Sequence, residues 1–397
     1  MSTHNPIQSG RARRALMAAL AGAAAVRLAE ASGPSAAAAA RLRQLMEQAR
    51  APTPAMLSSE EQAKRMKQRS ALLARGEAGL QSLDVQAALA AFERAAALMH
   101  AADSEMGLVR TYMQGGEYRR AMAFVAHTAN AHRDNAGGAA LYAWLLNLGG
   151  HGLNAQRMLA EAQERFAGDA LLQTVQRQLQ SRVPHATGAL LQAPARLAPY
   201  AKPVPAGARC RATGLLIDEG RRALVPATAS RDAVWLRNGL GQVSRASVET
   251  RLSNDLSVVR LAQPLPGSAA MLAPSDAFPG SVAFAVEYVT AIDASPSWPV
   301  LTGGFLGAAG AGAGVRSLGV ELPPGPRGGP VFDASGRLIG LAAATRRGAD
   351  RVLLVSALRV PLGERLGEPT AANTNKRPVD EIYESALQSV VQVIDAV

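Results

Sequence analysis

No proline occurs between Pro54 and Pro184, and this gap constrains the fold more than any other feature of the 397-residue chain. Proline interrupts helices because it lacks a backbone N–H and clashes with the preceding turn. Within the gap, apolar residues recur at helical spacing. From residue 187 onward, proline, glycine and β-branched residues alternate with short apolar runs, which is typical of antiparallel strands. The sequence therefore predicts an all-helical domain over 58–182 followed by an all-β domain over 187–364.

The helical block is internally repetitive. Three segments align, and their marker alanines stand 33 and 34 residues apart at Ala88, Ala121 and Ala155. This period, with small residues where paired helices approach each other, resembles the tetratricopeptide repeat. The resemblance implies a helical groove that binds a protein or peptide partner. It predicts four repeat-core positions: Leu108, Tyr112, Ala121 and Ala155.

Three stretches of the β domain resemble trypsin-like serine proteases of the HtrA type. The run Gly325-Pro-Arg-Gly-Gly-Pro resembles the nucleophile loop Gly-x-Ser-Gly-Gly-Pro, with Arg327 at the serine position. The run Leu-Val-Pro-Ala-Thr228 resembles the strand that ends in the catalytic histidine, and Asp255 stands where the catalytic aspartate opens its strand. The resemblance implies a trypsin-like double antiparallel β-barrel whose serine and histidine positions hold Arg327 and Thr228.

The resemblance also implies a pseudoprotease. The loop glycines survive as a remnant of the oxyanion loop at Gly325, Gly328 and Gly329. None of the six histidines lies in the 212 residues after His185, so the β domain contains no imidazole base. A serine–lysine dyad is equally unsupported, because Lys202 is the only lysine of that domain.

Two arrangements remain open for the retained aspartate. In the first, Asp255 forms an ion pair with Arg327, because a partly buried aspartate without a partner would be costly. In the second, Arg327 points to solvent and Asp255 caps local backbone N–H groups.

The residues that commonly hold metals or cofactors predict no such site. Cys210 stands alone, which excludes an intramolecular disulfide and a CxxC metal or redox motif. His127 and His132 are five residues apart on a repeat helix, a spacing that does not put two ligands on one face. We therefore expect no metal and no cofactor.

The N-terminal 31 residues have the three parts of a secretory signal peptide. Basic residues at Arg11, Arg13 and Arg14 precede a 12-residue apolar run, and Ala29-Glu30-Ala31 supplies a small-residue cleavage site. Twelve apolar residues are too few to span a bilayer, so we expect export to the periplasm and no membrane insertion. The alternative is an alanine-rich amphipathic helix. Residues 32–57 are interpreted as a linker or docking helix.

The net charge of +11 does not predict nucleic-acid binding, because arginines are spread along the chain and aromatics are only 4%. Residues 365–397 are interpreted as a flexible linker and a helix-then-strand segment that docks on its own barrel or a neighbour's, or as a single docking helix. The leading functional hypothesis is a non-catalytic exported scaffold. The alternatives are an active protease with atypical residues and a regulatory partner of one; the partner's identity and the oligomeric state stay open.

Overall fold

The computed structural model describes residues 58–395 apart from short gaps, and five positions before them: 40, 41, 43, 44 and 47. The gaps are 182–184, 231–232, 254, 268, 290–292, 311, 324, 345–349 and 370–374. The predicted signal peptide and most of the predicted linker at 32–57 lie outside the described residues.

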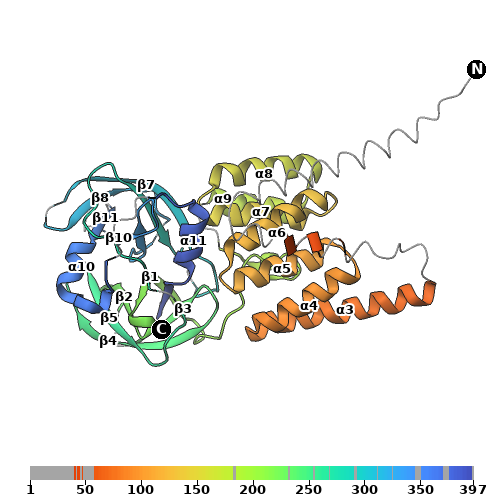
Figure 1. Cartoon of the computed structure of the whole chain (residues 1–397), viewed down its shortest axis with the longest axis horizontal. Helices are drawn as coiled ribbons and strands as arrows, with labels where there is room; N and C mark the ends of the chain where they lie inside the picture. Colours follow the sequence, from red (N-terminus) through yellow and green to blue (C-terminus); the bar gives the residue numbers. More distant parts are fainter. Residues whose placement is uncertain are drawn as a thin grey trace, which may run out of the picture.

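The N-terminal half is a stack of helices packed in consecutive pairs, with α9 closing the end of the stack (Figure 1). The helices are α3 (Ser59–Ser82), α4 (Val85–Leu98), α5 (Ala102–Gln114), α6 (Tyr118–Ala131), α7 (Ala136–Leu148), α8 (Gly152–Arg165) and α9 (Ala170–Gln180). The second helix of each pair begins one residue after Asp84, Glu117 or His151, as the repeat alignment predicts. The four predicted repeat-core residues Leu108, Tyr112, Ala121 and Ala155 are all buried. No helix in the described part of the chain is long and apolar enough to cross a membrane.

Two closed antiparallel barrels form the C-terminal half, which confirms the predicted trypsin-like double barrel. Barrel 1 contains β1 (Arg209–Ile217), β2 (Arg222–Pro226), β3 (Ala233–Asn238), β4 (Val243–Arg251), β5 (Leu256–Leu261) and β12 (Val390–Asp395). Barrel 2 contains β6 (Val282–Glu287), β7 (Val300–Ala309), β8 (Val315–Gly319), β9 (Pro330–Phe332), β10 (Leu338–Ala344) and β11 (Asp350–Leu354). Two further helices, α10 (Val355–Leu362) and α11 (Val379–Leu387), follow barrel 2. Each barrel encloses an apolar core of its own.

The C-terminal strand completes barrel 1. β12 lies between β1 and β3, with Val391 opposite Gly214 on one side and Asn238 on the other. In barrel 2 the corresponding place, between β7 and β9, is taken by β6, the first strand of that barrel. Both barrels therefore have the same strand order, except that barrel 1 receives its first strand from the end of the chain. The helix-then-strand alternative is confirmed, and the tail is part of barrel 1 instead of a segment outside it.

Helix α11 joins the helical stack to the barrels, and it lies between them in Figure 1. Tyr383 of α11 packs edge-on against Tyr118 of α6, with ring centroids 4.6 Å apart, and both side chains are fully buried. Arg119 donates hydrogen bonds of 2.9 and 3.0 Å to Glu384. The largest apolar cluster includes residues of the helices and of both barrels, so the two halves share one core.

Candidate functional site

Thr228, Asp255 and Arg327, the three positions predicted from the protease resemblance, line one cleft of about 430 Å³. Pro226 at the end of β2 and Leu341 to Ala344 of β10 form other walls, so the cleft lies between the two barrels. Three segments separated by up to a hundred residues therefore meet as the sequence predicts. Thr228 is exposed at the mouth, whereas Asp255 and Arg327 are partly buried.

Arg327 is bound by neighbours on two sides. Its guanidinium forms a two-pronged ion pair with Asp350 at the start of β11, at 2.6 and 2.9 Å. Nη1 also donates to the carbonyls of Pro323 and Gly325, at 2.5 and 3.1 Å. Both side chains of the ion pair are less than a fifth exposed. The guanidinium therefore connects the loop that carries Arg327 to the start of β11 in barrel 2.

Asp255 has a different partner from the one expected. Its carboxylate accepts a 2.6 Å hydrogen bond from Arg351, the residue next to Asp350. The hypothesis of an Asp255–Arg327 ion pair is therefore wrong, and so is the alternative in which Arg327 points to solvent. Strand β11 thus begins with two neighbouring residues of opposite charge. Asp350 binds Arg327, and Arg351 binds Asp255.

The loop glycines are required by close packing beneath the cleft. Gly328 has a φ of +136°, and a Cβ there would lie 2.2 Å from the Thr213 carbonyl oxygen. A Cβ at Gly329 would meet the Val286 carbonyl oxygen at 2.1 Å. Only glycine fits at these two positions, so packing alone accounts for both glycines.

Glu287 at the end of β6 binds the underside of the same loop. Its Oε1 accepts the Gly329 N–H at 3.0 Å, and the residue is 1% exposed. Burial raises the pKa of this carboxyl to about 7, although hydrogen bonds from Thr213 and the Gly329 N–H oppose the rise. A buried carboxylate therefore holds one of the loop N–H groups that the glycines bring inward.

No histidine in the described residues lines the cleft. His151 contacts Asp380 of α11 at 2.6 Å, and His185 lies 3.4 Å from Asp293. The remaining described histidines, at 100, 127 and 132, gather in the helical stack around Glu105. The helical domain therefore brings none of its described imidazoles to the positions where a proton acceptor would act.

Sequence reasoning missed the three charged residues that hold the cleft together, Glu287, Asp350 and Arg351. Asp350 and Arg351 follow the run Arg-Arg-Gly-Ala and precede the apolar run Val352 to Val355. The change of charge at Asp350, just before that apolar run, is the available signal. Glu287 gave a signal too, because it is the single acidic residue in the apolar run Ser281 to Val289.

No family model and no curated protein matches this chain. Among solved structures, the chain is similar to the Rv3671c protease of M. tuberculosis. The inactive form is 17% identical over 41% of this chain and 88% of that one, with a TM-score of 0.32. The active form is 17% identical over 43% and 83%, with a TM-score of 0.30.

The HtrA-type protease AlgW, solved with a decapeptide, is 19% identical over 37% of this chain and 49% of AlgW, with a TM-score of 0.32. At this level of similarity nothing about activity or ligands follows for this chain. The fold rests on the strand order of the two barrels.

Proposed function

We propose that this chain is a non-catalytic, exported scaffold that binds a protein or peptide partner through its helical repeats. The observation that carries the proposal is the binding of Arg327 by Asp350 and by its own loop carbonyls. A serine protease needs a hydroxyl at this position and an imidazole within hydrogen-bonding reach of it. Arginine offers no nucleophile, because its guanidinium stays protonated in proteins.

The residues around the cleft support a structural use of it. Asp255 is engaged by Arg351, and Glu287 holds the Gly329 N–H. Asp255 immediately precedes a strand of barrel 1 and Arg351 lies in barrel 2, so their ion pair stabilises the contact between the barrels and occupies the Asp255 carboxylate. The peptide-binding role is therefore assigned to another surface.

That surface is a cleft of about 400 Å³ between the helical stack and barrel 2. One wall comes from α7 and α8 and includes Asn147, Leu153 and Gln156, and the other comes from β7 between Val300 and Gly303. Leu153 is 80% exposed in this cleft, which is unusual for a leucine beside a pocket. An apolar side chain beside polar amides suits an extended peptide, which offers both side chains and backbone groups.

Activity is tested with a fluorophosphonate probe and a fluorogenic peptide mixture on the purified full chain. We expect no labelling and no hydrolysis above a heat-denatured sample, while trypsin in the same assay reacts. Labelling of any serine of the native chain would overturn the non-catalytic assignment.

Binding is tested by placing a photo-crosslinking amino acid at Leu153 and, as a matched control, at Val360. Val360 on α10 is 89% exposed and does not line the cleft. We expect a discrete crosslinked product from position 153 in the exported fraction and none from position 360. Equal crosslinking at the two positions would contradict a specific site.

Export is tested by fractionation and N-terminal sequencing. We expect the mature chain in the periplasmic fraction with Ser32 as its first residue. A chain that keeps residues 1–31 in the cytoplasmic fraction would overturn this part of the proposal.

A further inference from the structure

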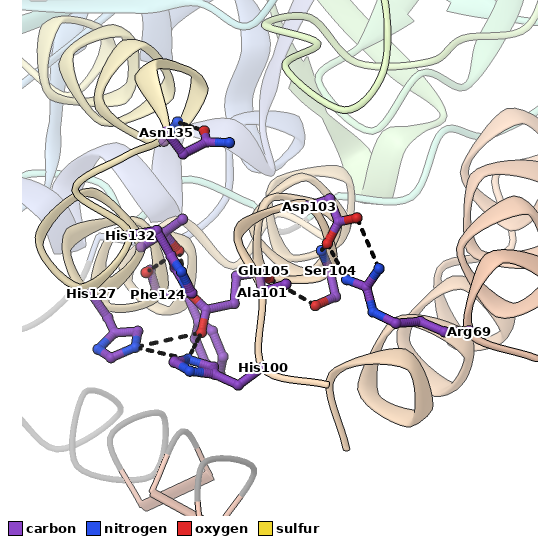
Figure 2. A network of polar contacts seen from close by, with 12 residues as sticks. Arg69, His100, Ala101, Asp103, Ser104, Glu105, Phe124, His127, His132 and Asn135 are labelled. Atoms are coloured by element: carbon purple, nitrogen blue, oxygen red, sulfur yellow. Dashed lines mark hydrogen bonds and ion pairs between the residues drawn. The ribbon is translucent and has the colours of Figure 1, made fainter. Parts of the chain in front are cut away.

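A cluster of three histidines surrounds one buried glutamate in the helical stack (Figure 2). His100 lies between α4 and α5, and Glu105 belongs to the first turn of α5. His127 lies near the end of α6, and His132 is the residue that caps the end of that helix. Four residues from three neighbouring segments therefore turn their polar atoms toward one point.

The expectation that His127 and His132 cannot bind one ion, because they are five residues apart on a helix, is wrong. Their ring nitrogens lie in the same cluster. His132 has left the helix, with φ −98° and ψ 65°, so its side chain does not follow the helical periodicity. The expected separation assumed that both residues lie within the helix. His100 precedes α5 and Glu105 lies on α5, so residue spacing along α6 does not reveal these two ligand-type residues.

The separations between the polar atoms fit a tetrahedral metal ion. Four ligands about 2.0–2.1 Å from a zinc ion lie about 3.3 Å from one another. The Nε2 atoms of His100 and His127 are 3.2 Å apart, and Glu105 Oε1 is 3.5 Å from His127 Nε2. Glu105 Oε2 is 3.3 Å from His132 Nε2. All the ligand atoms lie within 4.8 Å of one another.

The contact between His100 Nε2 and Glu105 Oε1, at 2.5 Å, is much shorter than a tetrahedral edge. His100 is the most exposed of the three imidazoles, with 28% of its side chain accessible. It is preceded by a non-helical segment at the end of α4, so it has room to move outward by a fraction of an ångström.

The second shell of the cluster also suits a cation. Thr128 donates a 2.8 Å hydrogen bond to Glu105 Oε2 and so fixes the orientation of the carboxylate. The neighbouring Asp103 carboxylate is not a member of the cluster, because it forms an ion pair with Arg69 (Figure 2).

His132 supplies a further observation. Its Nε2 is buried and makes no hydrogen bond of good geometry, although it faces Glu105. A buried polar nitrogen without a hydrogen bond is costly, and coordination of a metal would satisfy it.

We propose that His100, Glu105, His127 and His132 form a structural zinc site. Imidazole and carboxylate ligands suit zinc, and four protein ligands fill a tetrahedral shell without leaving a position for substrate. The ion would tie the connection between α4 and α5, where the first helix pair meets the second, to the end of α6. This site is independent of the proposed partner binding, which uses α8 and β7.

The test uses the full chain with an affinity tag that lacks histidine, stripped with chelator and then dialysed against zinc alone. We expect one zinc per chain by elemental analysis and a higher Tm for the zinc-loaded chain than for the stripped chain. Cobalt in place of zinc should give the intense visible absorption of a tetrahedral site.

The double variant His127→Gln with His132→Gln should lose the bound metal, the Tm increase and the cobalt spectrum. His151→Gln is the matched control, because it removes a histidine that pairs with a carboxylate elsewhere, and it should keep one zinc. Circular dichroism confirms that both variants are folded. A wild-type chain that retains no stoichiometric metal and shows no tetrahedral cobalt spectrum would overturn the proposal. Equal metal retention by the double variant would overturn it too, since the metal would then bind elsewhere.

Discussion

At the scale of single residues, the cleft between the barrels is organised by two ion pairs that share a strand end. Asp350 binds Arg327, and its neighbour Arg351 binds Asp255. The two pairs connect the loop that carries Arg327 and the start of β5 to the start of β11. Arg327 therefore has a partner that neutralises its largely buried charge.

Asp350→Ala should destabilise the protein by about 1–3 kcal/mol, because it leaves a largely buried guanidinium without its carboxylate. Urea unfolding measures the loss. Glu219→Ala is the control, because Glu219 is 79% exposed in its pair with Arg221 and such pairs contribute little. Equal effects of the two substitutions would show that the Arg327 pair has no special role.

Glu287 should make stability depend on pH. Its folded-state pKa of about 7 lies above the value of about 4.3 for an unfolded glutamate. The contribution of Glu287 to the free energy of unfolding is therefore fully present at a pH below about 4.3. It is lost as pH rises through the folded-state pKa, because the buried group must then ionise. Relative to Glu287→Gln, the wild-type chain should lose about 3 kcal/mol of stability between about pH 4.5 and about pH 8. Parallel pH profiles for the two proteins would contradict the shifted pKa.

At the scale of secondary-structure elements, β12 is the strand on which barrel 1 depends. Val390, Val391, Val393 and Ile394 are fully buried. Burial of each such side chain contributes about 1.5–3 kcal/mol, so together they match much of the stability of a typical domain.

A chain that ends at Ser389 should therefore fail to form barrel 1. We expect loss of the cooperative unfolding transition, measured by circular dichroism during heating, and binding of a dye that reports exposed apolar surface. A chain that ends at Asp395 keeps the whole strand and serves as the control. Native-like unfolding of the shorter chain would show that barrel 1 closes without β12.

The elements that local patterns encode were predictable from the sequence. The second helices of the repeats begin where the marker alanines place them, and Thr228, Asp255 and Arg327 meet in one cleft. The partner of Asp255 was not predictable, because Arg351 is 96 residues away in sequence and meets Asp255 only through the way the two barrels pack. The histidine cluster was missed for a similar reason, since His132 leaves its helix and two members, His100 and Glu105, lie outside α6.

At the scale of the whole molecule, the helical stack and the barrels form one body. Besides the tyrosine contact of α6 with α11, Gln114 of α5 donates to the carbonyl of Tyr200 at 3.1 Å. Tyr200 also binds Glu77 of α3 through its hydroxyl. The connection between the domains is thus packed against the helices, and the orientation of the repeats relative to the barrels is fixed by contacts on both sides.

Arg119 is a charged residue at the contact between α6 and α11. Its side chain and its backbone N–H both donate to Glu384, and Glu381 lies 3.7 Å from its guanidinium. Arg119→Glu would place a third carboxylate against these two, so repulsion should separate α6 from α11. We expect a larger radius of gyration by small-angle X-ray scattering and faster protease cleavage of the connection at 182–208.

Arg120→Glu supplies the matched control for the same charge change. Arg120 is the next residue, is 42% exposed and pairs with Glu117 of its own helix end. We expect scattering and cleavage rates like those of the wild-type chain, because the substitution does not touch α11. If both variants behaved alike, the fixed arrangement would depend on the buried tyrosine contact and the shared core instead of on the Arg119 ion pairs.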